Sequence, residues 1–212
     1  RIIYSNIRKF VFFLLSCNVG EILIIFLSIL FQLPIPFLPI QLLWLNLITD
    51  SFPALALGTE KGEPDIMDLP PRDAKEPILN DTMITGIIVQ STALTISVIL
   101  AFLWALKQYD GDLVMSRTIA FSTIVLAELI RAYSGRSERY SVLKLGIFSN
   151  RSLVWASLSS FALLVVVIYI PFLQTIFHTY ALGTRDWFVI LVFCMIPLLA
   201  GETSKLLLRK NK

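Results

Sequence analysis

Six long apolar segments dominate this sequence, and they limit how the chain can fold more than any other feature. They cover residues 7–31, 40–57, 83–106, 115–133, 153–172 and 187–208. Each approaches or exceeds the roughly 20 residues that an α-helix needs to cross a bilayer. Because lipid offers no partner to an unpaired backbone N–H or C=O, such segments cross it as helices. The sequence therefore predicts an all-α, polytopic membrane protein with six transmembrane helices.

The composition also points to lipid as the solvent. Apolar residues make up 56% of the chain and charged residues 16%, against about 45–50% and about 25% in soluble domains. The first apolar run follows basic residues, but it is longer than the core of a signal peptide and lacks a small-residue cleavage site. We therefore read it as a true span. A net charge of only +3 gives no support to nucleic-acid binding.

Lys and Arg residues are divided unevenly between the two sides of the predicted bundle. Of the 18, all but three fall on the side that holds both chain ends, and the three exceptions are Lys107, Arg117 and Arg185. Short cytoplasmic loops carry an excess of Lys and Arg in membrane proteins. The pattern predicts that both termini are cytoplasmic and that residues 58–81 form a cytosolic loop.

Carboxylates within the apolar segments mark the first candidate functional residues: Glu21, Asp50, Glu128 and Glu202. A charged side chain at bilayer depth costs at least about 2.5 kcal/mol, so each one needs a proton, a partner or an ion. Glu202 lies near the end of the last segment with Lys205 one helical turn later. This spacing predicts a local ion pair there.

Polar side chains accompany Glu21 and Asp50. Asn18 lies one turn before Glu21, and Asn46 and Thr49 share a helical face with Asp50. All of these groups offer oxygen, which hard cations such as Ca²⁺ prefer. The alternative use of the same residues is hydrogen bonding between helices, which is common in membrane bundles. Two carboxylates in the set favour the cation site.

Beyond these side chains, the sequence offers few candidate ligands. Pro53 lies inside the second segment, where it removes a backbone hydrogen bond and frees carbonyls in the preceding turn. Cys17 and Cys194 have no metal-ligand spacing, and we interpret both as small packing residues. His178 falls in a loop and is interpreted as a surface residue.

Glu128, in the fourth segment, has two roles open to it. It could be a further cation ligand, or Arg131, one turn later, could neutralise its charge as a partner. The spacing alone leaves both roles open.

The order of these motifs resembles one known family, the calcium-type P-type ATPases. Residues 16–21, Ser-Cys-Asn-Val-Gly-Glu, are similar to the motif of the family's fifth helix. Residues 41–58, with Asn-Leu-Ile-Thr-Asp and then Phe-Pro-Ala-Leu-Ala-Leu-Gly, resemble its sixth helix. Residues 65–77, with Asp-Ile-Met-Asp, Pro-Pro-Arg and Lys-Glu-Pro, resemble the cytosolic loop that follows.

The resemblance implies a C-terminal transmembrane domain with family helices five to ten. The family couples ATP hydrolysis to cation export through an aspartyl-phosphate, and its metal ligands match Asn18, Glu21, Asn46, Thr49, Asp50 and Glu128. The family's Asp-Lys-Thr-Gly phosphorylation motif is not found in this sequence. The chain is therefore expected not to be catalytic alone. ATP and Mg²⁺ would act in the full-length parent, and the expected partners are its remaining domains, its first four helices and the bilayer.

Two departures from the family pattern matter. Animal reticulum pumps usually carry Asn where this chain has Arg131, so a fixed positive charge could replace one bound ion or a counter-transported proton. The loop around Asp110 is short, as in bacterial-type enzymes. The resemblance thus implies a multi-pass protein of a bacterial cell membrane.

Three other functions remain open from the residues. The same type of pump could carry Mn²⁺ or Na⁺, because oxygen ligands do not fix the ion without cavity size and ligand count. A passive channel or secondary transporter could use the same acids, although the inverted repeats frequent in transporters are absent from the sequence. A structural membrane subunit would use the acids only as buried hydrogen-bonding groups.

Overall fold

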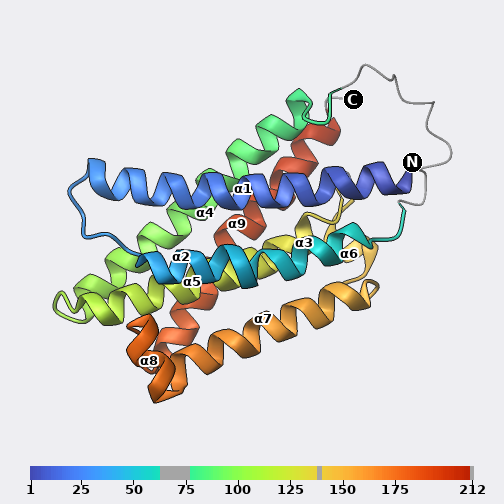
Figure 1. Ribbon diagram of the computed structural model, residues 1–212. Helices are drawn as coiled ribbons and strands as arrows, with labels where there is room; N and C mark the ends of the chain where they lie inside the picture. The colour runs from blue at the N-terminus through green and yellow to red at the C-terminus, as the bar shows by residue number, and fades with distance from the viewer. Residues whose placement is uncertain (63–76, 138–139, 211–212) are drawn as a thin grey trace.

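The computed structural model describes residues 1–62, 77–137 and 140–210, and within these ranges the chain forms helices and connections without any strand. Six helical units are long and apolar enough to cross a membrane, which confirms the predicted fold class. They are α1 (Ile2–Leu30), the interrupted unit α2 (Pro39–Trp44), η1 (Leu45–Thr49) and α3 (Ser51–Gly58), then α4 (Asp81–Gln108), α5 (Leu113–Ser134), α7 (Arg151–Tyr169) and α9 (Thr184–Lys210) (Figure 1).

Local sequence signals set where these helices begin. The side chains of Asn80, Asp112 and Asn150 accept hydrogen bonds from backbone N–H groups in the first turns of α4, α5 and α7, at 2.8–3.1 Å. Such side-chain caps satisfy donors that have no partner inside the helix. Pro39 and Pro171 occupy the first positions of α2 and α8, where a missing N–H costs nothing.

Two short helices were not predicted from the sequence: α6 (Val142–Leu145) and α8 (Pro171–Phe177). The second one explains why α7 ends at Tyr169, before the limit of 172 expected from hydropathy. Ile170 precedes Pro171 and adopts an extended conformation, since the proline ring disfavours a helical residue before it. The family-like loop motif at 65–77 lies, apart from Pro77, outside the described residues.

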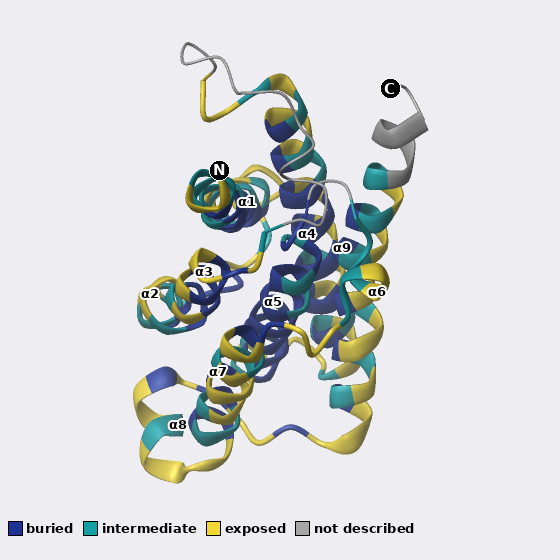
Figure 2. Ribbon diagram, turned by 90° about the vertical axis from the view of Figure 1, so that its right-hand side faces the viewer, coloured by how far each residue is buried: buried dark blue, intermediate teal, exposed yellow. Residues whose placement is uncertain are grey.

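The α5 helix forms the centre of the bundle. It is the most buried of the six spans and packs against α4, α7 and α9. Ile119, Phe121, Ile124 and Val125 on this helix are fully buried. Figure 2 shows the buried residues gathered around α5, whereas the outer faces of the surrounding helices are exposed.

Glycine residues allow α1 and α4 to approach closely. A side chain added at Gly20 would lie 2.8 Å from Leu94 Cδ2, and one added at Gly86 would lie 2.9 Å from Phe12 Cε2. Small residues at helix interfaces permit such packing in membrane bundles. Gly20 is adjacent to Glu21, so this interface also positions a candidate ligand.

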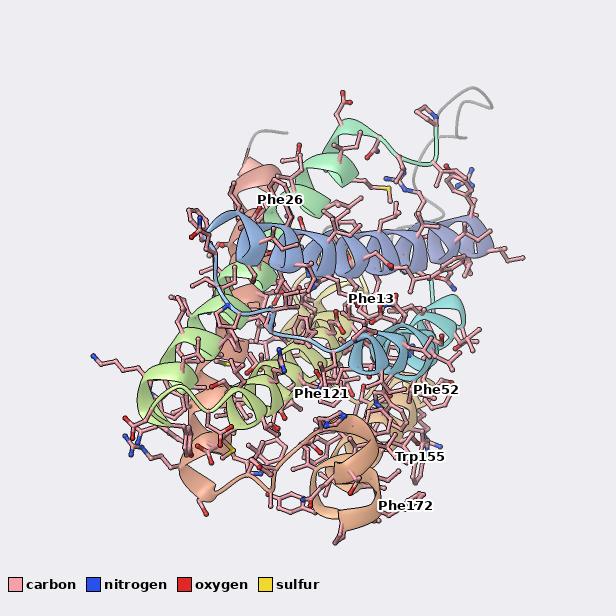
Figure 3. All side chains as sticks on the ribbon, turned by 60° about the vertical axis from the view of Figure 1, so that its left-hand side comes forward. Phe13, Phe26, Phe52, Phe121, Trp155 and Phe172 are labelled. Carbon is pink, nitrogen blue, oxygen red and sulfur yellow. The ribbon has the colours of Figure 1, made fainter. Side chains whose placement is uncertain are left out.

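Apolar side chains cover the outside of the bundle as well as its inside. Phe26, Trp155 and Phe172 are 56%, 69% and 73% exposed and point away from the bundle, whereas Phe13 and Phe121 point into it (Figure 3). Water would make so large an apolar exterior unfavourable. Surrounding hydrocarbon removes the cost of exposing these apolar side chains, in agreement with six helices that cross a membrane.

Candidate cation site

The second helical unit is irregular next to Asp50. In η1 the backbone follows a π-helical path, and the N–H of Asp50 donates to the carbonyl of Leu45, five residues earlier, at 3.0 Å. Pro53 has no N–H to donate to the carbonyl of Thr49. The wider turn and the proline together leave backbone carbonyls beside Asp50 with fewer helical partners. Single-turn π segments of this kind are frequent at functional sites.

Two carboxylates from different helices meet in the interior. Asp50 and Glu128 are 1% and 0% exposed, and a carboxylate oxygen of each lies within 4.8 Å of the other. Among the described residues, no N–H group and no Ser, Thr or Tyr hydroxyl donates to any of their four oxygens. Asp50 lies at the junction of η1 and α3, and Glu128 lies on α5. The helices α3 and α5 pack against each other and against α1 (Figure 2). An acidic pair without donors in an apolar bundle needs a cation or protons.

Glu21 lies beside this pair and has one assigned contact. The side-chain N–H of Asn46 donates to Glu21 Oε2 at 2.8 Å, whereas the buried Oε1 has no donor among the described residues. The charges of Glu21 and Asp50 are close enough to interact. The structure thus brings Asp50 and Glu128 together. It places Glu21, on α1, near enough to act on Asp50 electrostatically but outside the group of ligand atoms that lie within 4.8 Å of one another.

Arg131 places a positive charge at the same group without bonding to either central carboxylate. Its Nη2 donates to Ser16 Oγ at 2.5 Å and to Cys17 Sγ at 3.6 Å, so it connects α5 to α1. Its charge is close enough to act on both Asp50 and Glu128. Nη1 is buried and has no acceptor within the described part of the chain.

The remaining predicted ligands lie at the edge of the group. The Asn18 amide donates to the carbonyl of Leu14 in its own helix at 2.8 Å, and that side chain is half-buried. Asn46 is exposed apart from its contact with Glu21. The Thr49 hydroxyl is buried and has no partner among the described residues. The chain alone therefore does not enclose all six predicted ligands.

Cys17 joins the site although the sequence indicated only a packing role. Its sulfur lies within 4.8 Å of the carboxylate oxygens of both Asp50 and Glu128, while the residue also contacts the apolar cluster around Phe13. One signal was present in the sequence, because Cys17 precedes Glu21 by four residues and so shares its helical face. The other cysteine, Cys194, lies in the main apolar core as expected.

Two other predictions outside the site agree with the structure. Lys205 Nζ lies 2.8 Å from Glu202 Oε1, which is the expected local ion pair. His178 is exposed in the connection that follows α8. Neither residue contributes to the carboxylate group.

A buried polar network fixes the far end of the helix that follows Asp50. The Glu60 carboxylate accepts hydrogen bonds from Arg136 and, at 2.7 Å, from Asn150, and its backbone carbonyl accepts one from Asn6. Burial alone would raise the pKa of Glu60. The hydrogen bonds from Arg136 and Asn150 and the charge of Arg136 outweigh that effect and hold the pKa below its ordinary value.

Comparisons with known proteins place this geometry in context. The family model described as cation transporting ATPase, C-terminus matches residues 34–207. A calcium-transporting ATPase of Bacillus subtilis is 44% identical over all of this chain, and calcium-transporting ATPase 1 of Bacillus cereus is 38% identical over 97% of it. The human calcium-transporting ATPase type 2C member 1 is 33% identical over 96%. The chain spans 24%, 25% and 22% of the lengths of these relatives, respectively.

Proposed function

This chain belongs to the family of cation-transporting ATPases, as part of their C-terminal region, and on that premise we propose that it is the cation-binding membrane domain of an ATP-driven Ca²⁺ export pump. The family resemblance drawn from the sequence motifs is thereby confirmed. The relatives named calcium-transporting ATPases support Ca²⁺ as the transported ion. Two Bacillus proteins among them support a bacterial cell membrane as its location, and the Lys and Arg distribution supports cytoplasmic termini.

The observation that carries this proposal is the buried pair formed by Asp50 and Glu128. Their oxygens accept no hydrogen bond from an N–H group or from a Ser, Thr or Tyr hydroxyl among the described residues, and the two acids come from different spans that are far apart in the sequence. Leaving two such charges uncompensated in a bundle interior is strongly unfavourable. A divalent cation removes that penalty while the carboxylates supply oxygen ligands, which is the coordination that Ca²⁺ prefers.

Further ligands are available around the pair. Glu21 Oε1, the Thr49 hydroxyl and the carbonyls near the π-helical turn complete an oxygen-rich group. Asn18 and Asn46 lie at its open edge, where the exposed side of Asn46 can meet the remaining helices of the parent protein. In this proposal the first four helices of the parent close the site on that side.

The charge of Arg131 favours one bound Ca²⁺ at this group. Glu21, Asp50 and Glu128 together carry three negative charges when ionised, and the guanidinium of Arg131 offsets one of them. The remaining charge of −2 balances a single divalent cation. Arg131 thus takes the electrostatic place of a second ion.

Transport then requires the affinity of the site for Ca²⁺ to fall when the site opens to the far side of the membrane. Phosphorylation by ATP and Mg²⁺ in other domains of the parent would change the positions of α1 and α3 relative to α5. Protonation of the carboxylates would release the ion, because a neutral acid is a poor ligand. The irregular backbone between Leu45 and Asp50 offers a point where the second unit can bend.

Phosphoenzyme formation by the full-length protein tests this function. We expect Glu21→Gln to weaken Ca²⁺-activated phosphorylation by ATP and to retain phosphorylation by inorganic phosphate, which does not need an occupied cation site. Glu202→Gln is the matched control, because Glu202 pairs with Lys205 outside the carboxylate group. Equal Ca²⁺ activation in Glu21→Gln and the wild type would remove Glu21 from the transport site.

A further inference from the structure

Three possible ligand atoms of different chemistry converge at the centre of the bundle. The sulfur of Cys17 and a carboxylate oxygen of each of Asp50 and Glu128 lie within 4.8 Å of one another. We call these three residues the sulfur–carboxylate cluster. Its members come from α1, the turn between η1 and α3, and α5, and each is at most 1% exposed.

The cluster has ligand capacity that the rest of the fold does not use. Within the described ranges, none of the four carboxylate oxygens accepts a hydrogen bond from an N–H group or from a Ser, Thr or Tyr hydroxyl, and the thiol beside them belongs to the cluster itself. The sulfur accepts only a long contact from Arg131 Nη2, which also donates to Ser16 Oγ and can keep that bond when the sulfur turns away. A cation entering the cluster would therefore compete with few existing interactions.

The mixture of sulfur and oxygen selects a class of metal. Hard cations such as Ca²⁺ bind oxygen, whereas thiolate ligands favour Zn²⁺ and other thiophilic ions. Zinc binds Cys sulfur at about 2.3 Å and carboxylate oxygen at about 2.0–2.2 Å, so two such ligands on one tetrahedral ion stand about 3.6 Å apart. Small side-chain rotations bring three atoms that lie within 4.8 Å to that spacing.

We propose that the sulfur–carboxylate cluster binds a thiophilic divalent cation, Zn²⁺ or Cd²⁺, through the sulfur of Cys17 and one oxygen each of Asp50 and Glu128. Binding forms a metal–sulfur bond, breaks the S–H bond and releases the proton to solvent. The inference rests on the proposed function, because it assigns these two acids to the same cation site. Since the ions share ligands, Zn²⁺ or Cd²⁺ excludes Ca²⁺ from the site.

The second cysteine provides a matched control. Cys194 is also fully buried, but its Sγ donates to the carbonyl of Thr123 at 3.4 Å and it lies in the apolar core. No described carboxylate joins it in a group of possible ligands. Removing its thiol should therefore leave Cd²⁺ binding at the cluster unchanged.

The test is a titration of the purified full-length protein with CdCl₂, followed by the ultraviolet charge-transfer band of a cadmium–sulfur bond. We expect the band of the wild type to exceed that of Cys17→Ser by the absorbance of one cadmium–sulfur site per protein. The Cd²⁺ affinity of the variant should be at least about 10-fold lower. Cys194→Ser should match the wild type. An identical titration for Cys17→Ser and wild type would overturn the inference.

A second measurement uses only the wild-type protein, so it does not require any variant to fold. X-ray absorption of the wild-type protein loaded with one equivalent of Cd²⁺ should show one sulfur neighbour and otherwise oxygen. A shell of oxygen alone would overturn the inference.

Competition with Ca²⁺ separates this inference from the proposed function. Loss of radioactive Ca²⁺ binding when one equivalent of Cd²⁺ generates the Cys17-dependent band supports both. Unchanged Ca²⁺ binding alongside a Cys17-dependent Cd²⁺ band supports the thiophilic site and contradicts the shared Ca²⁺ site. Loss of Ca²⁺ binding in Asp50→Asn, together with a Cd²⁺ band independent of Cys17, overturns the inference and leaves the proposed function standing.

Discussion

Arg136 and Glu60 form a bidentate ion pair in the interior, with Nε 2.8 Å from Oε2 and Nη2 2.9 Å from Oε1. Their side chains are 1% and 6% exposed. Glu60 follows the end of α3, and Arg136 follows the end of α5, so the pair fixes these two helices to each other. Asp50 immediately precedes α3, and Glu128 lies on α5. The ion pair therefore helps to hold the carboxylate group in its arrangement.

Loss of Arg136 should destabilise the fold strongly. Arg136→Ala leaves the Glu60 carboxylate buried without its main partner, and breaking a buried pair in this way costs about 3–5 kcal/mol. Thermal unfolding in detergent measures the effect. Lys144→Ala in the same connection is the control, because Lys144 is exposed, and it should change stability little. Equal melting temperatures for the two variants would contradict the role of the pair.

The same pair predicts an acid-sensitive step in stability. The folded state holds the pKa of Glu60 below its ordinary value, so the stabilisation is complete above the ordinary glutamate pKa of about 4.3 and is lost as the pH falls through the lower, folded value. Melting temperature measured against pH should therefore fall less steeply on the acid side in Glu60→Gln than in the wild type. Parallel curves would show that Glu60 does not contribute.

Close packing of α1 on α4 should not tolerate a side chain at Gly20. Gly20→Ala places a methyl group 2.8 Å from the buried Leu94, and overpacking of this kind costs about 1–3 kcal/mol. Gly58→Ala is the control, since a side chain there meets nothing within 4 Å. In equilibrium unfolding, the double variant Gly20→Ala/Leu94→Ala should lose less stability than the two single variants added together, because the shortened side chain at 94 no longer meets the added methyl group. Strictly additive losses would contradict a clash between these two positions.

Arg131 should limit how many cations the site holds. Replacing it by Asn removes the positive charge beside Asp50 and Glu128 and leaves three acids facing the site. We expect Arg131→Asn to bind a second Ca²⁺ per phosphorylation site in equilibrium binding with radioactive calcium. Lys107→Gln, at an exposed position, should match the wild type. An unchanged stoichiometry in Arg131→Asn would contradict the charge argument.

The six spans could be predicted because hydropathy acts over about 20 residues and needs no tertiary information. Pro53 likewise indicated an irregular second unit, and the π-helical turn lies just before it. Hydropathy could not detect α8, whose start depends on Pro171 rather than on apolar content. The helix limits predicted from hydropathy therefore differ from the observed ones where a proline sets the boundary.

Contacts between residues that are far apart in the chain could not be predicted from the sequence. Cys17 carried only a weak signal, its position one turn before Glu21, and its sulfur meets the carboxylates only because α1, α3 and α5 pack together. The pairing of Glu60 with Arg136 joins residues 76 positions apart and has no local pattern. The contact of Arg131 with Ser16 likewise depends on helix packing and not on spacing along α5.

Equilibrium binding of radioactive calcium to the full-length Asp50→Asn protein shows whether the buried carboxylate pair holds the transported ion. Asp50 should be tested because it lies in the buried pair and next to the irregular backbone, and its replacement keeps size while removing charge. We expect Asp50→Asn to lose high-affinity Ca²⁺ binding, whereas the control Glu202→Gln should keep wild-type binding. Wild-type affinity and stoichiometry in Asp50→Asn would contradict this expectation.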